Sequence, residues 1–233
     1  MIDIHTHCLP GLDDGASDVN ESMEMLIDSR KQGVRVCVAT SHCTLHHPLG
    51  LKEFISGREL AWQKLKAKME QTEAELPKVL LGAEVYLDHD ISDFPELEKL
   101  CIGTTNYMLV EFSRETMSPL IPDWLYELTV RGIKPIVAHL DRYMEWEDIL
   151  NLTTGTDIIY QLNADNFMSF FGRRHIKKIL EYERNYIISS DMHNTSERAS
   201  KMHDAYKKSI KMFPSLTKKM FWDIGYEIIK KDI

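Results

Sequence analysis

Short apolar runs rich in β-branched residues alternate along the chain with longer amphipathic segments. This alternation is typical of repeated β/α units around a parallel sheet or barrel. The pattern predicts seven strands: Ile2 to His7, Val34 to His42, Lys78 to Tyr86, Asn106 to Phe112, Ile133 to His139, Asp157 to Leu162 and Tyr186 to Ser190. We therefore expect an α/β fold.

The segments between these runs have the features of helices. Asp18 is a suitable N-cap for a helix with an apolar stripe at Met23, Leu26 and Ile27, and Gly33 lies where that helix ends. Further helices are predicted over Leu51 to Leu76, Pro122 to Arg131, Arg173 to Glu183 and Ser196 to Met212. No linker or fixed-period repeat interrupts the alternation, so we expect one domain over residues 1–233.

Ionisable side chains collect at the carboxyl ends of the predicted strands, where a closed β/α barrel assembles its active site. They are His5, His7, His42, Glu84, Glu111, His139, Asp191 and His193. A strand sends alternate side chains to one face, so each His-x-His or Asp-x-His pair can reach one ion. A single such pair would also fit a solvated strand end.

Glu84 and Glu111 lie inside apolar runs, where an unpaired carboxylate would be costly to bury. A salt bridge could satisfy either acid, but several acids beside several histidines favour bound cations. Asp13-Asp14-Gly15 alone would be only a turn. Imidazole and carboxylate ligands without thiolate favour manganese, iron or zinc, and such a site activates water and binds a phosphoryl group.

Composition excludes several classes of protein. A net charge of −8 and a pI near 5.7 disfavour a nucleic-acid partner. No apolar run reaches the roughly 18 residues of a membrane span, and the start Met1-Ile2-Asp3 does not resemble a leader, so we expect a cytoplasmic protein without membrane insertion. Cys8, Cys37, Cys43 and Cys101 form no CxxC pair, and none precedes by six residues the Arg required by thiol-based tyrosine phosphatases.

Seven motifs in order resemble the PHP superfamily, named for polymerase and histidinol phosphatase. Within it, the chain is similar to the manganese-dependent tyrosine phosphatases of bacterial capsule and exopolysaccharide operons. The motifs are Ile2-Asp3-Ile4-His5-Thr6-His7, Asp13-Asp14-Gly15-Ala16, Ala39-Thr40-Ser41-His42, Gly82-Ala83-Glu84, Val110-Glu111-Phe112, Ala138-His139-Leu140-Asp141-Arg142-Tyr143 and Ser190-Asp191-Met192-His193-Asn194. They extend over nearly the whole chain.

The resemblance implies a distorted seven-stranded β/α barrel with two or three divalent cations at the carboxyl ends of its strands. Manganese is the first choice, with iron or zinc as alternatives. The implied ligands are His5, His7, Glu84 and Asp191 for one ion, Glu84, Glu111 and His139 for a second, and Asp14, His42 and His193 for a third. Arg142 and Arg198 match basic positions near the metals, and a guanidinium fork suits phosphate.

Two loops depart from the family pattern. Relatives commonly have Thr-Pro-His-His and His-Pro-Glu-Arg, where this chain has Thr40-Ser41-His42-Cys43 and His139-Leu140-Asp141-Arg142. All nine ligand positions are kept, so the departures concern specificity more than catalysis. Cys43 is interpreted as a packing thiol rather than a nucleophile.

The resemblance implies hydrolysis of phosphotyrosine on a protein, namely the tyrosine-rich tail of an autokinase that controls polysaccharide export. One alternative is a small-molecule phosphatase of the histidinol-phosphate type. Another is a metal-binding regulatory module without turnover, against which the complete ligand set argues. Phe167, Phe170 and Phe171 are candidates for a substrate groove, although burial in the core is the commoner explanation.

Overall fold

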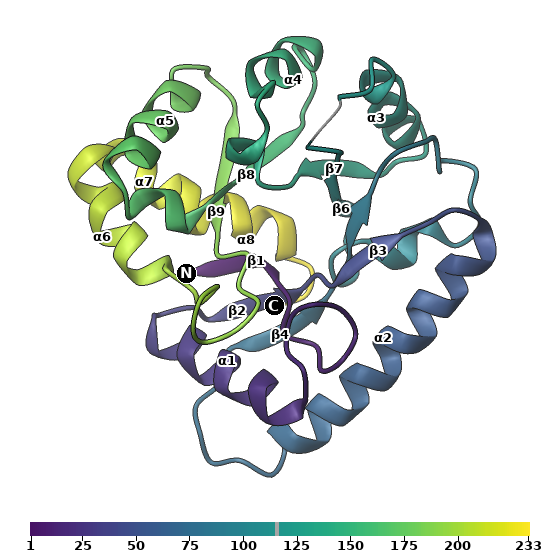
Figure 1. Ribbon diagram of the computed structural model, residues 1–233, viewed down its shortest axis with the longest axis vertical. Coiled ribbons are helices and arrows are strands. Elements are labelled where there is room, and N and C mark those ends of the chain that lie inside the picture. The colour runs from purple at the N-terminus through teal and green to yellow at the C-terminus, as the bar shows by residue number, and fades with distance from the viewer. Residues whose placement is uncertain (115–116) are drawn as a thin grey trace.

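The computed structural model describes residues 1–114 and 117–233 and places parallel strands inside a ring of helices (Figure 1). The strands are β1 Ile2–Thr6, β2 Val36–Ala39, β3 His42–Thr44, β4 Lys78–Leu81, β5 Glu84–Tyr86, β6 Tyr107–Glu111, β7 Lys134–Val137, β8 Ile159–Asn163 and β9 Asn185–Ser189. The α-helices are α1 Val19–Lys31, α2 Pro48–Met69, α3 Ile121–Val130, α4 Trp146–Leu152, α5 Phe170–Leu180, α6 Met202–Met212, α7 Pro214–Lys218 and α8 Ile224–Ile229. Short 3₁₀ helices are η1 Leu97–Leu100, η2 Leu140–Arg142 and η3 Ala164–Phe167, and η4 Lys219–Asp223 is π-helical.

The strands form two sheets in which every assigned pairing is parallel. One sheet has the order β1-β2-β4 and the other the order β3-β5-β6-β7-β8-β9. Parallel neighbours need crossover connections, which the surrounding helices supply. The predicted α/β class with parallel strands is therefore confirmed.

The predicted count of seven strands is not confirmed, because two of the predicted strands are each divided. Val34 to His42 becomes β2 and β3, and Lys78 to Tyr86 becomes β4 and β5. The breaks lie side by side, since Ala39 pairs with Leu81 before them and His42 pairs with Glu84 after them. At the break the Arg58 guanidinium donates to the Gly82 carbonyl over 2.8 Å, so a side chain satisfies a backbone group where the ladder bends.

The backbone ladder does not close between β1 and β9 in the described part of the chain. Side chains occupy that seam: Ile4 N donates to Ser189 Oγ over 3.2 Å, and Ser190 N donates to Asp3 Oδ1 over 3.0 Å. Backbone contact resumes only beyond β9, where Asp191 N donates to the His5 carbonyl over 2.9 Å. The predicted distorted barrel is therefore not closed: the strands form two open parallel sheets, with β1 and β9 bridged by polar side chains.

The helices follow the predicted pattern most closely at α1 and α3. Asp18 caps α1 by accepting from Asn20 N and Glu21 N. The predicted helix ending at Leu76 stops at Met69, and the one predicted from Ser196 begins only at Met202. The late start has a local cause, because Asn194 Oδ1 accepts from the backbone N–H groups of Ser196 and Arg198 and holds a turn there.

A β-branched core fills the space between the strands and the C-terminal helix. It includes Ile4, Val38, Ile136 and Ile187, all completely buried. Helix α8 approaches β1 so closely that a Cβ on Gly225 would lie 2.9 Å from Ile2 Cβ. This packing closes the amino ends of the strands and leaves the chemistry to their carboxyl ends. None of the described helices is both long and apolar enough to cross a membrane.

Candidate metal centre

Strand β1 and the residue that follows it place two buried imidazoles, His5 and His7, beside a shared pair of carboxylates. His5 Nε2 lies 3.2 Å from Glu84 Oε2 and 3.4 Å from Asp191 Oδ1. His7 Nε2 lies 3.3 Å and 3.4 Å from the same two oxygens. The four side chains that the resemblance assigns to one ion therefore meet around a single point.

Glu84 also faces a second group of ligands on β3, β6 and the end of β7. Its Oε1 lies 3.0 Å from His139 Nε2, whose distance to Glu111 Oε2 is 3.3 Å. His42 Nδ1 lies 3.0 Å from Glu84 Oε2 and 3.4 Å from Glu111 Oε1. Glu84 is thus shared by both groups, which is the position of a bridging carboxylate.

The third group forms where the loop after β1 meets the loop after β9. Asp14 Oδ1 lies 3.3 Å from both His42 Nε2 and His193 Nε2. The His193 ring stacks on His7, with centroids 3.7 Å apart. Donor atoms of His7, Asp14, His42 and His193 all lie within 4.8 Å of one another. All nine predicted ligand residues are therefore brought together, with His42 placed between two of the groups.

The electrostatics of the cluster favour positive charge. Burial alone would lower the pKa of His42, but hydrogen bonds with Glu111 and Glu84 outweigh it and raise the pKa to about 10. Burial would also lower the pKa of His139, but hydrogen bonds with the same two acids outweigh it and raise the pKa to about 9. Burial would raise the pKa of Glu84, yet the nearby His5 and the hydrogen bond from His139 hold it well below its usual range. Clustered carboxylates that favour cationic imidazoles would equally favour bound cations.

The ligand atoms themselves also fit metal ions. Burial and the neighbouring His7 lower the pKa of His193 to about 4, which favours the neutral imidazole that can bind a metal. Buried His193 Nε2 and Glu84 Oε2 make no well-aligned hydrogen bond with any described residue. Buried polar atoms are normally hydrogen-bonded, so atoms left in this way near a common point fit the donor set of a cation.

Asp13 supports the cluster without belonging to the predicted ligands. Its Oδ2 accepts from His7 Nδ1 over 2.7 Å and from His42 N over 3.0 Å. The hydrogen bond to Nδ1 leaves His7 Nε2 free to face a metal. Gly15 lets this loop approach β1, since a Cβ there would lie 2.1 Å from the His7 carbonyl oxygen.

Strand β8 supplies a second supporting pair that the sequence prediction missed. Gln161 Oε1 accepts from His139 N over 2.5 Å and lies 3.1 Å from His5 Nδ1. Gln161 Nε2 donates to Asn163 Oδ1 over 2.7 Å, and Asn163 Nδ2 donates to Asp191 Oδ2 over 3.2 Å. This buried amide chain connects three proposed ligands. The sequence signal that could have identified this pair is the presence of two polar residues, two positions apart, within an otherwise apolar run.

Two cluster residues have strained backbone. His139 has φ of 31° and Asp191 has φ of 52°, in the left-handed region that non-glycine residues rarely adopt. Each stands two residues beyond the end of a strand, β7 or β9, where the chain must turn sharply to direct a side chain into the cluster. Strain of this kind tends to accumulate at functional sites, where surrounding contacts hold it in place.

Both predicted phosphate-binding arginines lie at the edge of the cluster. Arg142 Nη1 is 2.6 Å from Asp191 Oδ2, and its side chain is a quarter exposed. Arg198 Nη1 is 3.3 Å from Asp14 Oδ2. Arg198 Nη2 also lies 3.6 Å from Asp191 Oδ2, so both guanidinium groups touch carboxylates of the cluster while their side chains remain partly exposed.

The other residues considered in the sequence analysis, Cys43 and three phenylalanines, differ clearly in their exposure to solvent. Cys43 is buried, and burial raises the pKa of its thiol to about 12, which disfavours a thiolate. Phe167 is fully buried, whereas Phe170 and Phe171 are 66% and 80% exposed.

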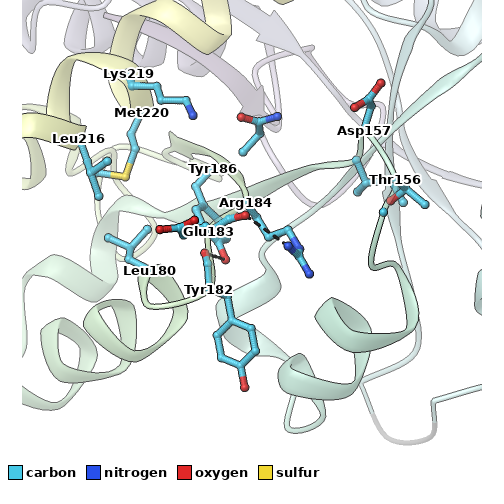
Figure 2. Close-up of a pocket in the computed structure, with 13 residues that line it drawn as sticks. Thr156, Asp157, Leu180, Tyr182, Glu183, Arg184, Tyr186, Leu216, Lys219 and Met220 are labelled. Carbon is cyan, nitrogen blue, oxygen red and sulfur yellow. Dashed lines mark hydrogen bonds between the residues drawn. The ribbon is translucent and has the colours of Figure 1, made fainter.

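A cavity of about 670 Å³ lies at the opposite, amino ends of β8 and β9 (Figure 2). Among the side chains drawn there are Asp157, Arg184 and Lys219, and none of the nine proposed ligands lines it. The cavity has no set of metal-binding donors among the described residues that is comparable to the cluster.

Fold and cluster define a parallel α/β protein with candidate metal-binding groups at the carboxyl ends of its strands. The chain belongs to the family described as capsular polysaccharide synthesis, CpsB/CapC, whose model matches residues 1–230. The family resemblance drawn from the motifs is therefore confirmed.

Curated relatives extend over most of the chain. It is 30% identical over 225 residues to the tyrosine-protein phosphatase CpsB of Streptococcus agalactiae serotype III, covering 89% of this chain and 88% of that protein. It is 30% identical over 244 residues to CpsB of Streptococcus pneumoniae, also named a tyrosine-protein phosphatase, with 98% of each covered. The tyrosine-protein phosphatase YwqE of Bacillus subtilis is 29% identical over 208 residues, covering 85% of this chain and 79% of that protein.

The fold is shared with a solved structure from work on YwqE of Bacillus subtilis and CpsB of Streptococcus pneumoniae, described there as unique metal-dependent tyrosine phosphatases. The TM-score is 0.83 at 23% identity, with 100% of this chain and 96% of that chain covered.

Proposed function

We propose that this chain is a metal-dependent phosphomonoesterase that hydrolyses phosphotyrosine on a protein, and that residues 1–233 act as one catalytic domain. The observation that carries the proposal is the meeting of nine imidazole and carboxylate side chains in one cluster, two of whose groups share Glu84. The names of relatives that match nearly the full chain supply the reaction. The two sheets would then represent a distorted barrel whose β1–β9 seam is sealed by side chains.

In this proposal His5, His7, Glu84 and Asp191 hold one ion, Glu84, Glu111 and His139 a second, and Asp14, His42 and His193 a third. Manganese is the first choice. Divalent cations held in this way supply Lewis-acid chemistry, lowering the pKa of bound water and neutralising charge on the phosphoryl group. The overlap of donor atoms at His42 and His7 supports a compact cluster rather than separate ions.

The protein's own residues orient the ligands and bind the substrate. Asp13 and Gln161 accept hydrogen bonds that fix the rings of His7 and His5. Arg142 and Arg198 flank Asp191 and offer planar N–H forks to phosphate oxygens. Because their positive charge lies beside the cluster, they would stabilise the negative charge that redistributes during transfer. The substrate proposed by resemblance is the tyrosine-rich tail of a bacterial autokinase, met in the cytoplasm.

The test compares substrates on purified protein supplied with manganese. A phosphotyrosine peptide should be hydrolysed with higher kcat/KM than histidinol phosphate, and a strong chelator should abolish both activities reversibly. Preference for histidinol phosphate would support a small-molecule phosphatase instead. Failure to hydrolyse even a generic aryl phosphate with metal bound would indicate a non-catalytic module.

A further inference from the structure

An exposed aromatic pair begins α5, on the loop that follows β8. Phe170 and Phe171 are 66% and 80% exposed, and their rings contact each other edge to face with centroids 5.7 Å apart. The first turn of α5 cannot collapse inward, because a Cβ on Gly172 would already lie 2.2 Å from the Asn166 carbonyl oxygen. The two rings are therefore held in solvent by packing beneath them.

Basic side chains continue this surface along the same helix. Arg174, Lys177 and Lys178 are exposed, while Ile176 and Ile179 face the core. Residues at spacings of three, four and seven share a helix face, so Phe171, Arg174 and Lys178 form one stripe. We name Phe170, Phe171, Arg174, Lys177 and Lys178 together the α5 surface.

The charge of this part of the chain contrasts with the rest. Residues 170–219 contain 12 Lys and Arg against 5 Asp and Glu, a formal charge of +7 in a chain whose total is −8. The remaining residues therefore carry −15. An anionic partner would be repelled by most of the protein and attracted to this segment.

The α5 surface is structurally connected to the edge of the metal centre. Asn166, just before α5, donates to the buried Asp141 carboxylate, and His175 on α5 lies within hydrogen-bond distance of the Asp141 carbonyl. Asp141 directly precedes Arg142, which contacts Asp191 of the cluster. Both sites also follow the carboxyl ends of strands, so they open at the same end of the molecule.

We propose that the α5 surface binds a second phosphotyrosine side chain of the same peptide whose first phosphotyrosine enters the metal centre. This rests on the proposed function and deepens it by assigning the peptide substrate a second contact site outside the metal centre. An aromatic ring packs on Phe170 and Phe171, and the attached phosphate pairs with Arg174, Lys177 or Lys178. Phosphotyrosine unites these two chemistries in one side chain.

An anionic membrane would also suit aromatic and basic side chains. However, a bilayer lying on the start of α5 would cover the end of the molecule at which the metal centre lies. A flexible peptide can reach both positions at once, and joining two contacts in one ligand raises affinity without any further contact. The observations therefore favour the peptide.

The experiment compares a peptide with one phosphotyrosine and a set carrying a second one at varied spacings, using manganese-loaded protein. At the best spacing KM should fall about fivefold to tenfold with kcat little changed. Phe170→Ser with Phe171→Ser, or Arg174→Glu with Lys178→Glu, should remove this advantage. Hydrolysis of a generic aryl phosphate should be unaffected, because the α5 surface touches no cluster residue.

Helix α2 provides the matched control, since Leu60, Lys64 and Lys68 are likewise exposed at helical spacing. Leu60→Ser and Lys64→Glu with Lys68→Glu should keep the preference. Affinity for a non-hydrolysable phosphonate analogue of the doubly modified peptide gives a readout independent of turnover.

Equal KM for all peptides, or equal losses in the α2 and α5 variants, would overturn this inference while leaving the proposed function intact. The same holds if α5 variants lose only binding to phosphatidylglycerol vesicles. If no phosphotyrosine peptide is hydrolysed, the proposed function fails. If, in addition, the α5 substitutions leave the affinity for the phosphonate analogue unchanged, the α5 surface is rejected as a docking site as well.

Discussion

The two ends of the parallel strands contain ionisable groups in opposite arrangements. At the carboxyl ends, Glu84 lies within 3.3 Å of four imidazoles and inside the protein. At the amino ends, the cavity of Figure 2 is lined by charged side chains that are mostly solvated or satisfied locally. Arg184 there donates to Thr154 Oγ1 and to the Glu183 carbonyl.

The comparison shows that a cavity lined by charged side chains is not by itself a site of chemistry. The cavity lacks converging donors among the described residues, whereas the cluster concentrates carboxylates whose charge requires compensation. Desolvation makes that requirement strong, because buried charges must be paired or bind metal. Substitutions matched between the two ends test this difference directly.

The largest contrast is expected for Glu84→Gln, which keeps the shape of the side chain and removes the charge shared by two ligand groups. Metal content measured by mass spectrometry should fall by at least one ion, and kcat for an aryl phosphate should drop about 1000-fold or more. Glu183→Gln at the cavity should change neither. Full metal content with wild-type kcat in Glu84→Gln would refute the bridging assignment.

The next largest contrast is expected between arginines at the two ends of the strands. Arg142→Ala should lower kcat/KM about 30- to 1000-fold, because a charge-assisted fork on the phosphoryl group is lost. Arg142→Lys should recover only part of this, since the charge returns without the fork. Arg198→Ala should behave similarly, and both should retain their metal.

Arg184→Ala in the cavity provides the matched control, with kcat/KM expected within about twofold of wild type. If Arg142→Ala and Arg198→Ala also hydrolyse phosphotyrosine peptide at the wild-type rate with metal bound, neither arginine contacts the phosphate.

A smaller effect is expected from the amide chain on β8. Gln161→Ala or Asn163→Ala should weaken metal binding about 10- to 100-fold, as loss of a partner that orients a ligand usually does. Competition with a calibrated chelator measures this without relying on turnover. Asn185→Ala, at the amino end of the adjacent strand, should leave the affinity unchanged. Equal affinities in all three variants would show that Gln161 and Asn163 only fill space.

The sequence predicted the parts of this molecule that depend on local rules. Strand alternation placed His5 and His7 on one face, and the carboxyl-end rule brought together ligands far apart in the chain. It missed the breaks near Gly82 and the side chains of Ser189 and Asp3 between β1 and β9, because these depend on which strands become neighbours.

The supporting residues were missed for a related reason. Gln161 and Asn163 carry no charge and lie in an apolar strand, so their roles appear only when the partners from β1, β7 and β9 are placed around them. Asp13 was interpreted as part of a turn, which it is, since its Oδ1 also accepts from Gly15 N. A single sequence cannot distinguish that role from the contact with His7.

The smallest effect is expected for Tyr186→Phe, which removes a single hydroxyl at the end of the strands where the cavity lies. The Tyr186 hydroxyl is 2.9 Å from the carbonyl oxygens of Ile179 and Tyr182 and ties the end of α5 to β9. Removing it should lower the free energy of unfolding by about 1 kcal/mol, because both carbonyls lose the hydrogen bond from the hydroxyl. In a chain of this size the melting temperature should fall by about 2 to 4 °C. Metal content and kcat/KM should stay at wild-type values, since the hydroxyl lies at the opposite end of the strands from Glu84. A fall in kcat/KM well below the melting transition would instead show that the two ends are mechanically coupled through β9, which leads directly to Asp191.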